Sequence, residues 1–515
     1  MKRFFYDWVP PRLDIWLMLL LSIILAFNSG IPSAISGYII GSQSAIPADM
    51  SMANFAYSCG MACVLPLTMR IKQLTSSKSI LCGALLIIIL MNFTLSQTNE
   101  PLVMVLASFV IGCVRMVATL EVVLSLMPIL MPKGERYQFY SVYYPISLIF
   151  GPLSGFLTAI ISDHVNWKFS FHLQNLFLFA GLLITVLFVH PKRYGRKIPL
   201  YQYDWLGTIF LAASLLLISY LFSYGLTKDW FTSMKMQGAA IGVMISLVLF
   251  LQRSLRVKRP LADLKVLTYW KAVAGLIMIF LLCLLYNSTS LLSPFMNIVL
   301  KSNQLESAKV NTYIIPGFIA GSLLSYVYYR KFTNFNVMAG MACVCFLASN
   351  IFMYYLTSSL TSSADLFLPL FFRGMAIAVS YISVGLYVAG SVPVSYFIDL
   401  STLLIILRSV ISPVLASALY ANLIYRGQIK YVNYLAGKMD GLNSYVTARG
   451  AGVVSSVKVQ ASMLAVRDVY GILIIAGIVL LAVIIVFPFH GSNKRTVLDW
   501  KSPFYKNDLA QAIPG

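Results

Sequence analysis

The sequence predicts an all-α polytopic membrane protein with fourteen spans. Three observations support this fold class. First, 59% of the 515 residues are hydrophobic and only 11% are charged, an apolar share well above that of a soluble globular chain. Second, the apolar residues gather in separate runs of about twenty residues, the length that a helix needs to cross a hydrocarbon core of about 30 Å. Third, the connections between the runs are mostly short and leave little chain for a soluble domain.

Each apolar run is one predicted span. The predicted spans are 13–34, 51–70, 79–97, 102–127, 138–162, 169–189, 204–225, 236–252, 272–298, 310–329, 335–356, 364–389, 396–424 and 468–489. A cleaved signal peptide is the alternative for the first run, because Lys2 and Arg3 precede it. We favour a spanning helix, since this run is longer than the apolar part of a signal peptide and begins after Pro10 and Pro11.

The seven cysteines all fall inside predicted spans. This placement is typical of small packing residues, and neither a disulfide framework nor a metal site is expected.

The net charge of +21 would suggest a nucleic-acid partner in a soluble protein, but in a membrane protein the side on which Lys and Arg lie is informative. Positive residues concentrate in connections on one side, above all in 192–197 and 253–259. This asymmetry predicts an inner-membrane protein with both termini in the cytoplasm and no nucleic-acid partner.

A weak internal repeat divides the chain into two halves. The fourth span contains FVIGCVRMVAT with Arg115, and the fourth span of the second half contains LFFRGMAIAVS with Arg373. The following spans share a break, IFGPLSG in the first half and VISPVLA in the second. Duplicated bundles leave this kind of trace in transporters. The predicted organisation is an N-terminal six-helix bundle (1–200), two inserted helices (201–262) and a C-terminal six-helix bundle (263–515).

Several short motifs resemble the major facilitator superfamily, and within it the fourteen-span drug:proton antiporter branch. They are GPLSG at 151–155, Arg115 in the fourth span, VNWKFSFHLQN at 165–175, YDWLG at 203–207, YGLTKDW at 224–230, PGF at 316–318, RSVIS from Arg408, and QASMLAVRDVYG at 460–471. The resemblance covers nearly the whole chain. It implies the major-facilitator fold and alternating access, in which two bundles rock around a central cavity.

Two departures from the branch pattern affect coupling. The first span contains AFNSGIPSAISG, with Asn28 where the branch usually has an aspartate. The connection after the second span contains PLTMRIKQLTSSK, which keeps Arg70 but not the rest of the inward latch.

Charges inside the membrane are functional candidates, because each costs at least about 2.5 kcal/mol at the bilayer centre. Arg115 and Glu121 are six residues apart, so they point about 120° away from each other and each needs another partner. Glu121 is either a proton-binding carboxylate or a structural one bonded to a neighbouring helix. Arg115 either tunes proton affinity at the cavity or binds free backbone carbonyls.

The second half offers Arg408 as its cavity candidate. Arg373 and Asp365 lie toward the outer end of their span, where charged side chains reaching the surface are the simpler interpretation.

Polar and flexible positions complete the candidate site. Asn28 and Asn287, with Ser288 and Thr289, lie on the first helix of each half and are expected to line the cavity. We rank them above the aromatic candidates, which are Tyr38, Tyr143, Tyr144, Tyr286 and Tyr381. Gly151, Pro152 and Gly155 are the candidate gating motif of the fifth helix, with ordinary close packing as the alternative.

The sequence therefore predicts a secondary active efflux transporter that exchanges small, largely apolar organic compounds for protons, with no cofactor. A carrier for another metabolite or siderophore, or a membrane scaffold or sensor without transport, are the alternatives. An intramembrane enzyme is disfavoured, because the four histidines are scattered near helix ends. The stretch 425–467 either docks a periplasmic adaptor or is a solvated loop with an amphipathic helix, and we favour the loop.

Overall fold

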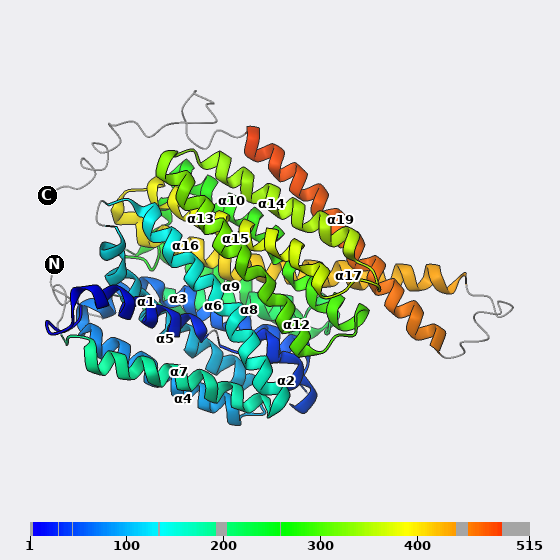
Figure 1. Cartoon of the computed structure of the whole chain (residues 1–515), viewed down its shortest axis with the longest axis horizontal. Coiled ribbons are helices and arrows are strands. Elements are labelled where there is room, and N and C mark those ends of the chain that lie inside the picture. The colour runs from blue at the N-terminus through cyan, green and yellow to red at the C-terminus, as the bar shows by residue number, and fades with distance from the viewer. Residues whose placement is uncertain are drawn as a thin grey trace.

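The computed structural model describes residues 4–28, 30–43, 45–131, 134–191, 203–257, 259–438 and 452–486. Within these residues the chain is a bundle of helices (Figure 1), and its extended structure is limited to an isolated bridge between Phe5 and Val189. The all-α prediction is confirmed.

Thirteen helical segments of the described chain are long and apolar enough to cross a membrane. Seven lie before residue 257: α3 (Pro47–Leu74), α4 (Ser77–Gln97), α5 (Pro101–Leu130), α6 (Arg136–His164), α7 (Trp167–Phe188), α8 (Trp205–Tyr224) and α9 (Met234–Arg256). Three later segments are single helices or nearly so: α14 (Phe335–Leu356), α15 (Phe367–Ser391, preceded by η8, Ala364–Leu366) and α19 (Gly452–Val486).

The other three segments change helix type along their length. Trp270–Val299 consists of α10 (Trp270–Tyr286), the 3-10 turn η5 (Asn287–Leu291), α11 (Leu292–Pro294) and the π-helical η6 (Phe295–Val299). Gln304–Lys331 consists of α12 (Gln304–Asn311), η7 (Thr312–Ile314) and α13 (Ile315–Lys331). Phe397–Ala436 consists of α16 (Phe397–Ile405), the π-helical η10 (Ile406–Ile411) and α17 (Ser412–Ala436).

The first predicted span is a broken helix. Helix α1 (Pro11–Phe27) ends before Asn28, and the chain resumes as η1 (Ser33–Ile35) and α2 (Ser36–Gln43). Gly30 has φ +78°, which helices do not use, and Pro32 has no backbone N–H to donate. The continuous span expected over 13–34 is therefore wrong. The thirteen long segments and this broken one account for the fourteen predicted spans.

Glycine brings two helices of each half into backbone contact. A Cβ added to Gly112 of α5 would lie 2.0 Å from the Tyr57 carbonyl oxygen of α3, and one added to Gly374 of α15 would lie 2.2 Å from the Ile314 carbonyl oxygen just before α13. Small residues permit such close approach in membranes. The second and fourth spans of each half thus pack by the same device.

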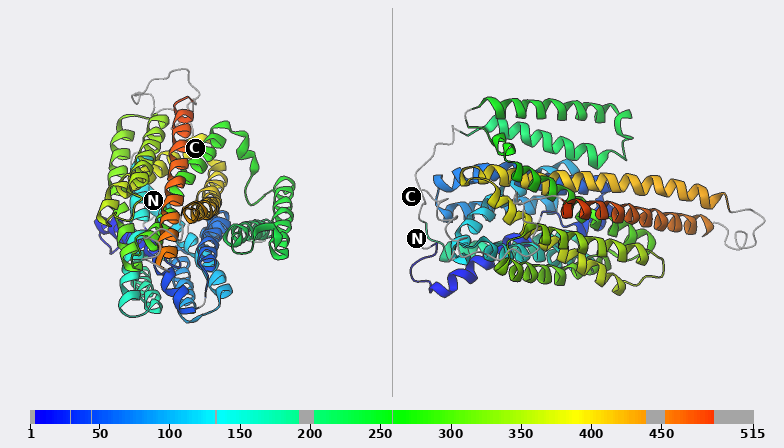
Figure 2. Two further views of the ribbon diagram at one scale, coloured as in Figure 1. Left: turned by 90° about the vertical axis from the view of Figure 1, so that its right-hand side faces the viewer. Right: turned by 90° about the horizontal axis from the view of Figure 1, so that it is seen from above.

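Helices α8 and α9 stand beside the remaining helices as a separate pair (Figure 2). Helix α9 packs on α8, and α8 packs on α3 and α17. The Asp204 carboxylate caps α8 by accepting a hydrogen bond from the Gly207 N–H at 2.9 Å, and it also binds the Arg253 guanidinium at the far end of α9.

Helices α17 and α19 form an antiparallel hairpin that projects past the other helices (Figures 1 and 2). The Tyr431 hydroxyl donates to Asp468 Oδ2 at 2.6 Å, and Gln428 Nε2 donates to Ser462 Oγ at 3.0 Å. The favoured prediction, a solvated loop with an amphipathic helix over 425–467, is therefore wrong for most of that stretch, because two long helices occupy it and small and polar side chains pair them. Residues 439–451, Arg449 included, lie outside the described chain.

Candidate functional site

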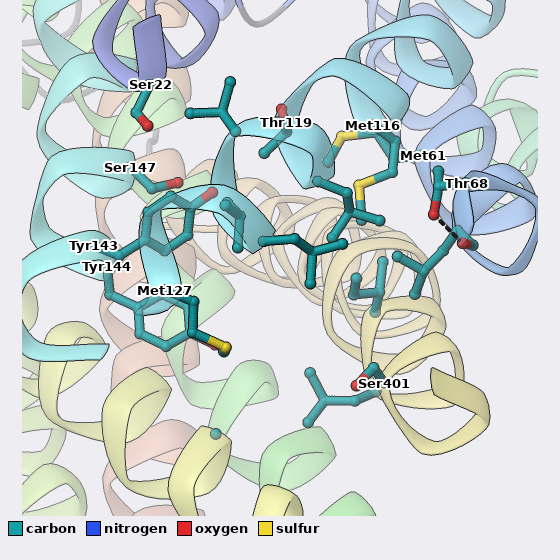
Figure 3. A pocket seen from close by; sticks show the side chains of 18 of the residues that line it. Ser22, Met61, Thr68, Met116, Thr119, Met127, Tyr143, Tyr144, Ser147 and Ser401 are labelled. Carbon is teal, nitrogen blue, oxygen red and sulfur yellow. Dashed lines mark hydrogen bonds between the residues drawn. The ribbon is translucent and has the colours of Figure 1, made fainter. Parts of the chain in front are cut away.

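A cavity of about 250 Å³ lies between the two halves of the chain. Its wall comes from α1, α3, α5 and α6 of the first half and from α15, α16 and η10 of the second. Figure 3 shows Tyr143 and Tyr144 from α6 facing the same space as Met61, Met116 and Ser401. Both halves therefore contribute to one site.

The cavity lies toward one end of the bundle. Its lining residues fall in the later parts of α3, α5 and α15, in the early part of α6, and along α16 into η10. At the other end the halves are in contact, because a Cβ on Gly37 of α2 would lie 2.3 Å from the Gln304 amide nitrogen of α12. The two halves are thus in contact at one end, and the cavity lies toward the other.

Two arginines lie on the cavity wall, Arg115 and Arg408. The Arg115 guanidinium lies 5.5 Å from the centre of the Tyr57 ring. The Arg408 guanidinium lies 4.4 Å from the centre of the Tyr381 ring and 5.9 Å from that of Tyr144. Cation–π attraction to these rings holds both side chains.

Tyrosines of α6 form most of the aromatic part of the wall, together with Phe139 and Phe397. Tyr140 and Tyr144 stack with ring centres 5.3 Å apart, and Tyr144 meets Tyr381 of α15 edge to face at 6.0 Å. We ranked the tyrosines below the asparagines, and Tyr140 was not among the tyrosines that we named. The signal was present in the sequence, because Tyr140, Tyr144 and Ser147 recur at spacings of four and three on one helix face.

Glu121 lies off the cavity wall, with its own partners. It is 3% exposed, accepts a hydrogen bond from the Ser77 hydroxyl, and has Oε1 3.5 Å from Lys72 Nζ. Arg115 and Glu121 thus have separate partners, as their spacing predicts. The carboxylate joins the end of α3 and the start of α4 to the later part of α5.

The asparagines also lie off the wall. Buried Asn28 accepts a hydrogen bond from the Gly30 N–H at 3.3 Å, and Asn287 Nδ2 donates to the Cys283 carbonyl at 2.7 Å. Each side chain binds backbone near its own helix break, so the expectation that they line the cavity is wrong.

The surface interpretation of Arg373 is wrong as well. Its side chain is fully buried, and Nη2 donates to Asn350 Oδ1 at 3.3 Å. Asn350 in turn accepts from the Ser288 hydroxyl at 3.3 Å. Gly112 and Gly374 occupy equivalent positions in the two halves. Arg373 therefore lies about one helical turn before the position equivalent to Arg115, and this offset explains why the two arginines have different surroundings. Asp365 is exposed at the start of its span, as expected.

The GPLSG motif packs against the break in the first helix. The Ser154 hydroxyl donates to the Phe27 carbonyl at 2.6 Å, and a Cβ on Gly155 would lie 3.5 Å from Ala34 Cβ. A Cβ on Gly151 would meet nothing within 4 Å, so only the later part of the motif contacts the break. Pro152 lies inside α6, where it removes a backbone donor.

Comparisons with known proteins point to transporters. No family model matches the chain. Over 309 residues it is 23% identical to the lincomycin resistance protein LmrB of Listeria monocytogenes, covering 59% of this chain and 64% of that protein. It is 28% identical over 109 residues to the trichothecene efflux pump TRI12 of Trichoderma arundinaceum, covering 20% of this chain and 18% of the pump. The chain thus spans less than two thirds of the length of these relatives.

Solved structures resemble the chain over nearly its full length. A POT family transporter in complex with 5-aminolevulinic acid has a TM-score of 0.58 at 12% identity, covering 93% of this chain and 98% of that one. The nucleoside transporter NupG has a TM-score of 0.54 at 12% identity, covering 91% and 98%. These neighbours, like the sequence relatives, are transporters rather than enzymes.

Proposed function

Because this chain is a divergent member of the major facilitator superfamily, we propose that it is a secondary active efflux transporter that works by alternating access. The observation that carries the proposal is the cavity between the two halves, which is walled by helices of both and lies away from the end where α2 and α12 are in contact. A site shared by two bundles is exposed to one face or the other when the bundles rock.

The substrate is a small organic molecule. A cavity of about 250 Å³ lined by methionines, leucines and tyrosines suits a compact, largely apolar body, and Met side chains adapt to several shapes. We place the protein in the inner membrane with both termini in the cytoplasm, which puts the cavity at the cytoplasmic end. The α17–α19 hairpin is then the surface available to a periplasmic adaptor.

Protons drive the exchange through Glu121. Protonation would remove the negative charge that Lys72 and the Ser77 hydroxyl bind, and would loosen the contact between α3, α4 and α5. Buried ionisable groups of this kind are typical proton carriers in transporters.

The test is dye efflux from proteoliposomes that carry an imposed proton gradient. Efflux should stop when an ionophore collapses the gradient, and Glu121→Gln should uncouple it while Asp365→Asn, at an exposed position, leaves it unchanged. Efflux that survives the ionophore favours a carrier without proton coupling. Absence of flux for every compound, with stable binding of a partner, favours a scaffold or sensor.

A further inference from the structure

The charged residues on the cavity wall are all of one sign. Arg115 and Arg408 lie among the lining side chains, and the described lining contains no Asp or Glu. A cavity that combines apolar walls with unbalanced positive charge favours negative groups.

Neither arginine is neutralised within the described chain. No ion pair there involves either side chain, and the buried Nε of each has no hydrogen-bond partner. Both guanidinium groups lie over tyrosine rings, and Arg408 also has a hydrogen-bond interaction with the Tyr144 side chain. Both side chains are only partly exposed, and a charge with limited access to water and no opposite charge beside it is unfavourable, so an anion entering the cavity would stabilise both arginines.

The two arginines can bind the same ligand. Tyr143 lies within electrostatic range of both guanidinium groups. The Tyr143 and Tyr144 rings are 6.1 Å apart, and Tyr144 lies under Arg408. Through these two neighbouring tyrosines, both guanidinium groups belong to one cavity, whose volume suits a small molecule.

We propose that the cavity binds amphipathic organic anions: a carboxylate or sulfonate held by Arg115 and Arg408, with an apolar body against the methionines and tyrosines. The inference rests on the proposed function and narrows its substrate class. Guanidinium groups bind such oxyanions through paired N–H donors. A cation of the same size would be repelled by both arginines.

The first experiment compares three probes that share one ring system: 2-naphthoate, 2-naphthamide and 2-naphthylmethylammonium. Binding to the purified full chain in detergent is measured by equilibrium dialysis. The anion should bind at least about tenfold more tightly than the amide, and the cation most weakly. Equal or tighter binding of the amide or cation, or no binding of the anion, overturns the proposal.

The second experiment assigns the preference to the two arginines. Arg115→Gln and Arg408→Gln should each weaken 2-naphthoate binding by about ten- to a hundredfold and leave 2-naphthamide unchanged, whereas Arg408→Lys should retain part of the preference. Arg467→Gln is the matched control, because Arg467 lies over Tyr354, away from the cavity, and its loss changes the net charge equally. A preference for the anion that survives both cavity variants overturns the assignment.

Transport distinguishes this inference from the function on which it rests. Anion binding without gradient-driven flux would refute the transporter proposal and leave the binding site intact. Gradient-driven flux of neutral compounds with unchanged rates in both arginine variants would leave the transporter proposal intact and refute the anion site.

Discussion

Replacing Gly112 with alanine tests whether the close contact between α3 and α5 holds the first half together. The new Cβ would lie 2.0 Å from the Tyr57 carbonyl oxygen, a full ångström inside the 3.0 Å limit that Cβ atoms respect. The Tyr57 oxygen belongs to the backbone of α3 and the Cβ is fixed directly to the backbone of α5, so the helices themselves must move apart. Overpacking costs about 1–3 kcal/mol, and rigid backbone on both sides places this site near 3 kcal/mol.

Alanine also favours the helix over glycine by about 1 kcal/mol, so the expected net loss is about 2 kcal/mol. Gly83→Ala in α4 is the matched control, because its Cβ would meet nothing within 4 Å and only the favourable helix effect remains.

Thermal unfolding in detergent, followed with a dye that reacts with exposed thiols, measures both variants, since all seven cysteines are free. Gly112→Ala should melt several degrees below the wild type, and Gly83→Ala at or slightly above it. If Gly112→Ala melts with the wild type, or both variants fall equally, the close-packing argument is refuted.

Three further predictions use the same unfolding assay. Asn350→Ala should destabilise the protein by about 1.5–3 kcal/mol, because it removes the hydrogen-bond acceptor of the buried Arg373 charge. Arg373→Met should be nearly neutral, because it removes the charge itself. Equal losses of stability in the two variants would contradict this prediction. Ser154→Ala should cost about 1–3 kcal/mol by leaving the last carbonyl of α1 without its hydroxyl donor, and an unchanged melting temperature would show that this bond is dispensable. Lys72→Met should lower the melting temperature by isolating the carboxylate of Glu121, and adding Glu121→Gln should restore it; failure of this rescue would mean that the ion pair is not the cause.

The sequence was sufficient to predict thirteen of the fourteen apolar runs as long helical segments. Their length follows from the thickness of the hydrocarbon core that a spanning helix has to cross. The break in the first helix was not predicted, although Gly30 and Pro32 were visible as signals for it. The hairpin of α17 and α19 was missed because pairing such as Gln428 with Ser462 joins residues far apart in the sequence.

The candidate site was predicted in part. Arg115 and Arg408 lie on the cavity wall, because a charge within an apolar span is unfavourable where it faces lipid. Asn28 and Asn287 do not, because short amide side chains can satisfy themselves on nearby backbone. Arg373 was misplaced because its burial depends on α14, which local spacing along α15 cannot reveal.

The α17–α19 hairpin can amplify small movements of the second half. Helix α19 is about 52 Å long at 1.5 Å per residue, well beyond the thickness of a hydrocarbon core, and it is rooted on α14 of the second half. In the alternating-access cycle proposed above, a small tilt of that half would therefore be magnified toward the projecting end of the hairpin. A fluorophore at exposed Tyr434, paired with one on α4, would turn each transport cycle into a change in energy transfer.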